Sequence, residues 1–433
     1  MKRLDILAVF SLIAVICGCQ GSSDTSRDAI NVIPPLASTV KAYTPHLIDS
    51  SSVFVVESGG TSAYLINKAG KRLYTWTFNL SLGADLELLP NGKLLGMFKA
   101  PNPGFSFGGG YGGVIQIINP DSSIDWEFQY VTDDLLAHHD LELLPNGNIL
   151  FLAWERIDSV TAKKAGASVS YDIFPEMVVE IDTATKEVVW HWRSWDHIVQ
   201  DAIAGQPTYG VVAENPEKIN INYLLRPDGD IMHANGLGYD PDNDLIFISV
   251  NYFSEVWVVD HSTSTAEARG DSGGKFDKGG NLIYRFGNPE AYDNVNGTRL
   301  FDRIHFPNLL KKEGRQTPNV LIYENGLTAK QSTVYEFEMP EKLGLLPDHD
   351  NEPKVVWSFT DSLLSYGRIS GAVRASNGNT LICEGDYGFW EVTVDGEVAW
   401  KYNDSSATFW RGYLFYQNDK ALSFLTGKAD EKF

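Results

Sequence analysis

Cysteine is scarce in this chain, and the shortage excludes several kinds of site. The three thiols are Cys17, Cys19 and Cys383. The first two stand close together near the N-terminus, which leaves Cys383 alone in the rest of the chain. We therefore expect no intrachain disulfide and no cysteine-based metal site.

Basic residues are outnumbered as well. The sequence has 35 Lys and Arg residues against 56 Asp and Glu residues, which gives a formal net charge of −21. Nucleic acids bind surfaces that are positive over a wide area, so we expect no nucleic-acid partner. The same balance argues against a highly sulfated polymer spread over the surface. A single anionic group can still be held in a locally cationic pocket.

Long hydrophobic runs are missing, except for one short run near the N-terminus. Lys2 and Arg3 precede an apolar stretch over residues 6–16, which is too short to cross a bilayer. It ends in Ile16-Cys17-Gly18-Cys19, which resembles the bacterial lipobox. We predict a lipoprotein signal peptide over residues 1–18, lipidation of Cys19, and a polar tether within residues 19–45. The alternative is an ordinary signal peptide that happens to contain cysteine.

The residue after the predicted cleavage site indicates a location. Gln20 follows Cys19, where an Asp would resemble an inner-membrane retention signal. We therefore expect a lipoprotein of a Gram-negative bacterium, attached by its lipid to the outer membrane on the periplasmic side.

Glycine and aromatic residues are plentiful, helix-like patterns are few, and two short units recur along the chain. The first unit is a hairpin, seen in "ADLELLPNGKLLGMF" from Ala84, "HDLELLPNGNILFLA" from His139 and "SGAVRASNGNTLICEG" from Ser370. The second unit is a strand, a polar turn and a strand that closes on an aromatic residue. Six such closing strands occur, at Trp76, Trp126, Trp190, Tyr284, Trp357 and Trp400.

Two hairpins per repeat and six repeats predict an all-β fold, a six-bladed β-propeller with four-stranded blades over residues 46–433. A β-sandwich or a pair of barrels is the alternative, because the spacing is irregular. The longest interval, "AGQPTYGVVAENPEKININYLLRPDGD" from Ala204, is predicted to be a loop over one face of the disc.

Three histidines hold comparable positions at the first strand of their repeats. They are His139, His233 and His305, whereas Ala84 and Ser370 occupy this position in other repeats. The first strand of each blade lines the channel of a propeller, so the three imidazoles are predicted to converge there. A structural residue would suit every repeat, and this selective use favours a functional site. Each histidine taken alone can also be explained as a hydrogen-bonded turn residue.

The chain as a whole resembles the bacterial arylsulfotransferases. The resemblance rests on "HHDLELLPNGN", "EMVVEIDTATKEVVWHWRSWDHIVQD", "DIMHANGLGYDPDNDLIFISVNYF", "YRFGNP", "YENG" and "SGAVRASNGNTLICEGDYGFWEV", in this order. It implies a periplasmic six-bladed propeller that moves a sulfuryl group from an aryl sulfate to a phenolic acceptor, without a nucleotide sulfate donor. It also implies two steps, through a sulfurylated channel histidine. We expect no cofactor and no metal ion.

The resemblance also suggests roles for individual residues. Family members carry a histidine, which we take as the nucleophile, just before the final "ISGA" run, and Arg368 stands there in this chain. An arginine cannot form that intermediate but binds sulfate well. We therefore predict His305 as the nucleophile, with His233 second, and Arg368 as a catalytic anion-binding residue. The predicted substrate-binding residues are His139, His138, Asn235 and Asn325.

Adjacent residues on a strand face opposite ways. Only one of the twin histidines can then point down the channel, and the repeat register favours His139 over His138. Two other functions fit the same pocket: a non-catalytic propeller that binds a sulfated or other anionic ligand, and a polysaccharide lyase on a propeller scaffold.

Overall fold

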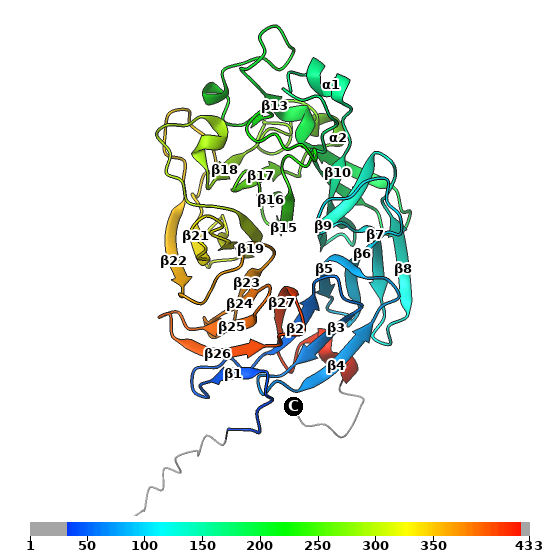
Figure 1. Ribbon diagram of the computed structural model, residues 1–433, viewed down its shortest axis with the longest axis vertical. Coiled ribbons are helices and arrows are strands. Elements are labelled where there is room, and N and C mark those ends of the chain that lie inside the picture. The colour runs from blue at the N-terminus through cyan, green and yellow to red at the C-terminus, as the bar shows by residue number, and fades with distance from the viewer. Residues whose placement is uncertain (1–32, 426–433) are drawn as a thin grey trace, which may run out of the picture. The chain divides into compact units, whose positions relative to one another are not determined.

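Short apolar runs broken by tight turns form antiparallel strands along the chain. The turns of the first unit place glycine at a positive φ, +80° at Gly92 and +88° at Gly147, a conformation that glycine adopts without steric cost. The computed structural model describes residues 33–425 (Figure 1). Cys19 and the predicted signal peptide lie outside the described residues.

The strands are arranged as six blades around a channel, which confirms the predicted propeller (Figure 1). Five sheets have four strands and one has a fifth at its outer edge. From the channel outward, the first three blades are β27 (Phe409–Phe415), β2 (Ser52–Glu57), β3 (Ser62–Ile66) and β4 (Arg72–Thr77); β5 (Leu82–Leu88), β6 (Leu94–Lys99), β7 (Gly113–Ile118) and β8 (Ile124–Gln129); and β9 (Leu135–Leu143), β10 (Ile149–Glu155), β11 (Glu176–Ile181) and β12 (Val188–Arg193).

The remaining blades follow the same order. They are β15 (Ala234–Asp240), β16 (Leu245–Val250), β17 (Glu255–Asp260) and β18 (Tyr284–Phe286); β19 (Ile304–Leu310), β20 (Asn319–Glu324), β21 (Thr333–Glu338) and β22 (Lys354–Thr360); and β23 (Gly371–Arg374), β24 (Thr380–Glu384), β25 (Gly388–Val392) and β26 (Val398–Asn403), with β1 (Val40–Tyr43) outermost. The six predicted closing aromatics all lie in the fourth strand of their blades.

The two ends of the described chain complete the ring. The C-terminal strand β27 pairs with β2, so the first blade is built from both ends, a feature that the repeat pattern did not predict. Strand β1 pairs with β26 on the last blade. It lies within the 19–45 segment that we assigned to the anchor and tether, so the sheets begin before residue 46.

Helical turns are few and lie in connections between strands or after the last strand. The α-helices are α1 (Ser159–Lys164) and α2 (Thr265–Ala268), and the 3-10 turns are η1 (Ser194–His197), η2 (Val212–Glu214), η3 (Pro289–Tyr292) and η4 (Lys420–Leu425). The interval between the third and fourth blades also carries a two-stranded parallel sheet of β13 (Ile198–Val199) and β14 (Ile219–Asn220). Within residues 33–425, no helix is long and apolar enough to span a membrane.

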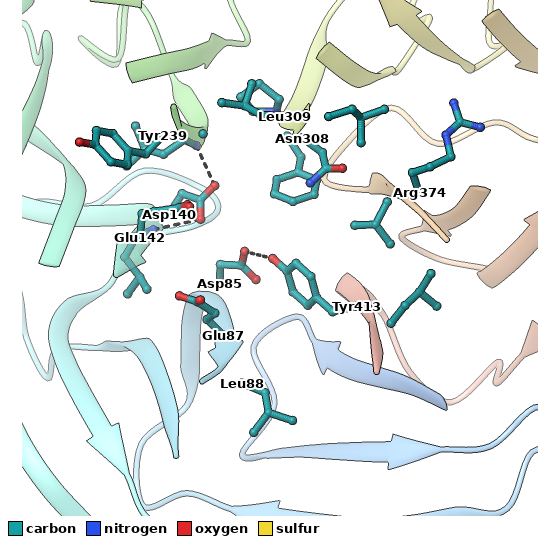
Figure 2. A pocket seen from close by; sticks show the side chains of 18 of the residues that line it. Asp85, Glu87, Leu88, Asp140, Glu142, Tyr239, Asn308, Leu309, Arg374 and Tyr413 are labelled. Atoms are coloured by element: carbon teal, nitrogen blue, oxygen red, sulfur yellow. Dashed lines mark hydrogen bonds between the residues drawn. The ribbon is translucent and has the colours of Figure 1, made fainter. Parts of the chain in front are cut away.

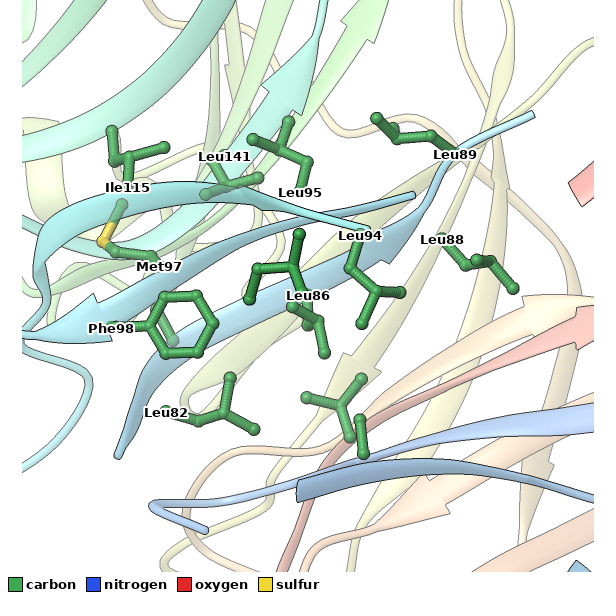
Figure 3. Packing of buried hydrophobic residues seen from close by; sticks show 14 of the residues in the cluster. Leu82, Leu86, Leu88, Leu89, Leu94, Leu95, Met97, Phe98, Ile115 and Leu141 are labelled. Atoms are coloured by element: carbon green, nitrogen blue, oxygen red, sulfur yellow. The ribbon is translucent and has the colours of Figure 1, made fainter. Parts of the chain in front are cut away.

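Apolar side chains from neighbouring blades pack against each other and hold the ring together. In one cluster, Leu86 of β5 and Leu95 of β6 belong to the same packed group as Leu141 of β9 in the next blade (Figure 3). The innermost strands also approach closely. A Cβ on Gly236 of β15 would lie 2.8 Å from Pro307 Cδ of β19, so a larger residue would push these strands apart.

Candidate functional site

The inner ends of the blades enclose a cavity of about 650 Å³. Every blade contributes to its wall from its innermost strand or the residues just before it, and the three predicted histidines are all part of the wall. This placement agrees with the predicted convergence of His139, His233 and His305. The remaining wall residues include the aromatic side chains Phe107, Tyr252, Tyr366 and Trp410.

An irregularity in the inner strands turns side chains toward this cavity. His139 and His233 have φ values of 57° and 54°, and Phe306, next to His305, has 59°. The ladder register shifts in β9 and β19 at these places, as in a β-bulge. Bulges change the direction of side chains at functional sites. A positive φ at or beside a cavity histidine occurs here in three successive blades.

His305 has a defined tautomer. Its Nδ1 lies 2.7 Å from Asn325 Oδ1, while Asn325 Nδ2 donates to the carbonyls of Tyr366 and Ile369. The amide oxygen therefore accepts the hydrogen of Nδ1, which leaves the lone pair of His305 on Nε2. Burial lowers the pKa of His305 to about 3, so the ring is neutral near pH 7. A neutral imidazole with a free Nε2 is a nucleophile.

His233 has the opposite electrostatic setting. Its Nδ1 forms an ion pair with Asp230 Oδ2, and its ring stacks on Tyr252 with centroids 4.8 Å apart. Burial lowers its pKa, but the charge and hydrogen bond of Asp230 outweigh burial and raise the pKa of His233 above its ordinary value. The ring is thereby suited to carry positive charge at the cavity wall.

His139 is backed by two buried polar residues. Its Nδ1 lies 2.8 Å from His138 Nδ1, and His138 Nε2 lies 2.8 Å from Glu176 Oε2. The His139 ring stands 4.6 Å from that of His233, between centroids. Burial lowers the pKa of His138 and of His139 well below the ordinary value, and raises the pKa of Glu176 well above it.

Positive side chains gather at the cavity despite the negative net charge. Lys99, Arg226, Arg303 and Arg368 all line it. Arg226 pairs with Asp228, whereas no described carboxylate lies within ion-pair distance of Lys99, Arg303 or Arg368. Arg368 is exposed, and its Nη2 lies 3.5 Å from the Tyr366 hydroxyl. Uncompensated cations at one concave place attract an anion.

Three predicted substrate-binding residues lie behind the wall. Asn235 is fully buried, with its Nδ2 donating to Ile304 O at 2.8 Å and its Oδ1 accepting from Ser249. Asn325 is committed to His305 and to two carbonyls, and His138 to His139 and Glu176. These side chains hold the wall residues in place, and His139 is the twin histidine that reaches the cavity, as the register indicated.

Several wall residues escaped the sequence analysis. Asp230 and Arg226 come from the long interval before the fourth blade, which was expected only to cover one face. Tyr252 and Arg303 lie in loops beside the predicted histidines, and the Arg303 guanidinium is 4.6 Å from the Tyr252 ring. A signal was present, since Asp230 stands three residues before His233, but short polar loops carry no periodic pattern.

A second cavity, of about 500 Å³, lies at the other end of the channel and is lined by the same inner strands (Figure 2). It is acidic. Asp85, Glu87, Asp140 and Glu142 line it. Arg411 is buried between the two cavities, with its Nη2 3.5 Å from Asp140 Oδ2 and its Nε 3.8 Å from Asp85 Oδ2. Tyr413 donates a hydrogen bond to Asp85.

Two solved structures share a distant likeness with the chain. A functionally unknown protein from Desulfotomaculum acetoxidans is 10% identical, with a TM-score of 0.43, and the match covers 85% of this chain and 99% of that one. The β-propeller domain of Cps50 (Swd1) from Myceliophteria thermophila is 11% identical, with a TM-score of 0.40, and the match covers 82% and 88%. No curated protein matches the chain.

The family comparison is more informative. The family described as Arylsulfotransferase (ASST) matches residues 127–409, a range that runs from the end of the second blade to the first residue of β27. It includes His139, His233, His305 and Arg368. The resemblance drawn from the sequence motifs is thereby confirmed, and the chain belongs to the arylsulfotransferase (ASST) family.

Proposed function

We propose that this protein transfers a sulfuryl group from an aryl sulfate to a phenolic acceptor, with His305 Nε2 as the nucleophile. The observation that carries the proposal is the state of His305. Its hydrogen is held on Nδ1 by Asn325, its pKa is lowered by burial to about 3, and it lines the cavity. Attack on sulfur by Nε2 gives sulfohistidine and an aryl oxide, and a second phenol then takes the group.

The cavity supplies what this reaction requires around the sulfur. Negative charge on the sulfuryl oxygens is matched by Arg368, Lys99 and the protonated form of His233. Phe107 and Trp410 offer aromatic surface for the aryl ring of donor or acceptor. A cavity of about 650 Å³ has the size of an ordinary small-molecule site.

The test is incubation with 4-nitrophenyl sulfate and phenol, with release of nitrophenolate as the signal. Wild-type protein is expected to release it, and His305→Ala to lose all transfer. His349→Ala is the matched control, because the His349 side chain is exposed, lies outside the cavity and bonds through Nδ1 to Pro347 O. Mass spectrometry without acceptor should find one sulfuryl group on the peptide that contains His305. Full activity in His305→Ala would contradict the assignment.

A non-catalytic function is the second candidate, and position 368 favours it. Arg368, in place of the nucleophilic histidine expected from the resemblance, is an anion-binding group without an ion-pair partner among the described residues. Under this candidate, an aryl sulfate binds by calorimetry but is not cleaved, and Arg368→His gains transfer. Turnover by the wild type decides against it.

We further propose that the lipobox directs the protein to the periplasmic side of the outer membrane. The motif Ile16-Cys17-Gly18-Cys19 at the end of a short apolar run supports this location. Cys19→Ala is expected to release the protein from membrane fractions and to remove the lipid mass. Membrane retention of that variant, without a change in mass, would speak against lipidation.

A further inference from the structure

Behind His139, a chain of hydrogen bonds leads away from the cavity into the third blade. His139 Nδ1 meets His138 Nδ1 at 2.8 Å, and His138 Nε2 meets Glu176 Oε2 at 2.8 Å. The exposed fractions of His138, His139 and Glu176 are 0%, 2% and 1%. The attack by His305 uses none of these three residues.

Packing and a backbone hydrogen bond hold His138 and Glu176 of this hydrogen-bonded series in place. The His138 ring stacks on Trp154, with centroids 3.7 Å apart and planes inclined by 17°. Glu176 Oε1 accepts the backbone N–H of Ala234 at 2.7 Å, which ties the carboxyl to the first strand of the next blade. The positive φ of His139 lets two adjacent histidines contact each other, although regular strand geometry would send them to opposite faces.

Only two proton patterns satisfy both contacts while the two rings stay neutral. When Glu176 is protonated, it donates to His138 Nε2, His138 Nδ1–H donates to His139 Nδ1, and His139 carries its hydrogen on Nε2. When Glu176 is ionised, every bond reverses, and His139 Nε2 holds a lone pair. The two patterns differ by one proton, and that proton enters or leaves at His139 Nε2, on the residue that lines the cavity.

Both patterns avoid a buried cation. Burial lowers the pKa of His138 and His139 well below the ordinary value, so neither ring stores a proton as imidazolium. Burial also raises the pKa of Glu176 well above its ordinary value, which makes its protonated form available. The negative charge of the other pattern falls on a carboxylate that already accepts a backbone N–H.

We propose that Glu176, His138 and His139 form a proton relay that protonates the aryl oxide leaving the donor sulfate and later deprotonates the acceptor phenol. The inference rests on the proposed sulfuryl transfer. In the first half, His305 Nε2 bonds to sulfur, the S–O bond breaks with its electron pair on the aryl oxygen, and that oxygen takes the proton of His139 Nε2. Glu176 gives its proton to His138 Nε2, His138 gives its Nδ1 proton to His139 Nδ1, and Glu176 ends as the carboxylate.

The second half restores the starting state. The acceptor phenol gives its proton to His139 Nε2, its oxygen bonds to sulfur, and the S–N bond breaks with its electron pair returning to His305. The relay protons move back toward Glu176. His139 acts on the reacting oxygens directly, while His138 and Glu176 are positioning residues that set its protonation.

The test compares two donors that differ in leaving group. Nitrophenolate leaves readily without a proton, whereas the oxide of phenyl sulfate needs one. Glu176→Gln is expected to lower kcat/KM for phenyl sulfate by about 10²–10⁴-fold, the usual contribution of general acid catalysis, and to change the value for 4-nitrophenyl sulfate little. His138→Gln should give the same selective loss, because it breaks the relay at its middle member.

Glu180→Gln is the matched control. Glu180 lies in the same strand, is also buried, and bonds to His261 and two asparagines outside the cavity. It should leave the ratio of the two donors unchanged. Equal loss for both donors in Glu176→Gln and His138→Gln overturns the relay while leaving the transfer function intact. A wild type that cleaves neither donor overturns the transfer function, and the relay with it.

A second measurement needs no variant. Nitrogen-15 spectra of the wild type should show His138 and His139 exchanging tautomers together as pH changes, with neither ring becoming imidazolium. Rings that titrate separately to imidazolium would overturn the relay, even if a variant fails to fold.

Discussion

At the scale of single residues, the site depends on which nitrogen carries a hydrogen. Asn325 decides this for His305, because its amide nitrogen is already committed to the carbonyls of Tyr366 and Ile369. Asp230 acts on His233 through charge instead. Two histidines on one cavity wall are thereby prepared for different tasks, one as a neutral nucleophile and one as a cation.

Asn325→Leu tests this control of the tautomer. Leucine has a similar volume but no acceptor, so the His305 hydrogen is free to move to Nε2 and block attack. We expect kcat to fall by about 10²–10⁴-fold, as when a histidine loses its orienting partner. Asn325→Asp keeps an acceptor oxygen and is expected to retain more activity than Asn325→Leu. Steady-state kinetics with 4-nitrophenyl sulfate compares the two variants, and equal losses would contradict the role.

Arg368 provides a second test at this scale. The side chain reaches the cavity without an ion-pair partner among the described residues, so its charge is available to the sulfuryl oxygens. Arg368→Ala is expected to lower kcat by about 10²–10³-fold, the usual loss of one transition-state donor. Arg368→Lys keeps the charge without the planar fork of donors, so its kcat should lie between those of the wild type and Arg368→Ala. Unchanged kcat in Arg368→Ala would remove this residue from the mechanism.

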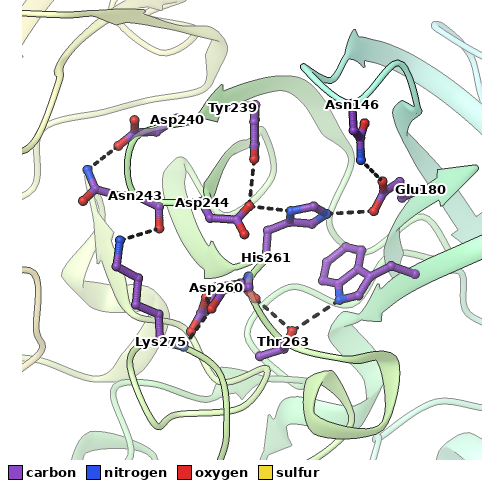
Figure 4. A network of polar contacts seen from close by, with 12 residues as sticks. Asn146, Glu180, Tyr239, Asp240, Asn243, Asp244, Asp260, His261, Thr263 and Lys275 are labelled. Atoms are coloured by element: carbon purple, nitrogen blue, oxygen red, sulfur yellow. Dashed lines mark hydrogen bonds and ion pairs between the residues drawn. The ribbon is translucent and has the colours of Figure 1, made fainter.

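At the scale of elements, polar contacts between blades supplement the apolar packing. His261, which follows β17 in the fourth blade, bridges Asp244 of its own blade and Glu180 of β11 in the third (Figure 4). The contacts measure 2.7 Å to Asp244 Oδ1 and 3.1 Å to Glu180 Oε2. Tyr239 also donates to Asp244. Both ring nitrogens face carboxylates, so the bridge is strongest when His261 is protonated.

This bridge should make stability depend on pH. Burial lowers the pKa of His261, but the hydrogen bonds and charges of Glu180 and Asp244 outweigh it and raise the pKa. The stabilisation is complete below the ordinary histidine pKa of about 6.5 and is lost as pH rises through the raised value of the folded state. We expect His261→Gln to lower the free energy of unfolding by about 1–2 kcal/mol near pH 6, and by less near pH 9.

Urea unfolding of wild type and His261→Gln at both pH values measures the effect. His349→Gln serves as the control, since this histidine is exposed and outside the bridge. A loss that is larger at the higher pH would show that the bridge does not depend on imidazolium.

At the scale of the whole molecule, the last strand, β27, closes the ring of blades. The same strand places Arg411 in the channel. Arg411 of β27 contacts Asp140, Asp85 and the carbonyls of Asn235 and Ser370, which belong to four other inner strands or the residues before them. Its side chain is 2% exposed. Burial raises the pKa of both aspartates, and the guanidinium opposes this rise. Closure of the ring by β27 therefore places the positive charge of Arg411 beside the buried carboxyl groups of Asp85 and Asp140.

Arg411→Met is expected to destabilise the fold by about 3–5 kcal/mol, because it leaves buried carboxylates without a counter-charge. Urea unfolding measures the change. Lys93→Met is the control, since its ion pair with Asp125 is partly exposed and worth at most about 1 kcal/mol. Adding Asp85→Asn and Asp140→Asn to Arg411→Met should recover part of the loss. A loss no larger than that of the control would mean that Arg411 is not the central counter-charge.

Much of this architecture was predictable because it is written in local patterns. A hairpin with an Asn-Gly turn recurs in three blades, a closing aromatic recurs in all six, and each of these patterns depends on neighbours in sequence. The three cavity histidines were found in the same way, since each stands at one register of a repeat. The closure by β27 was not predicted, because it joins the two ends of the chain and repeats nowhere.

The sequence by itself determined the six blades, the family and the convergence of His139, His233 and His305. Only the tertiary structure decided which partner each histidine has. His138 meets Glu176 across 38 positions, and Arg411 meets Asp140 across 271. No local pattern encodes such pairs. The positive φ at His139 also overrides the two-residue alternation of a strand, so its direction follows from the packing of the inner strands around one channel.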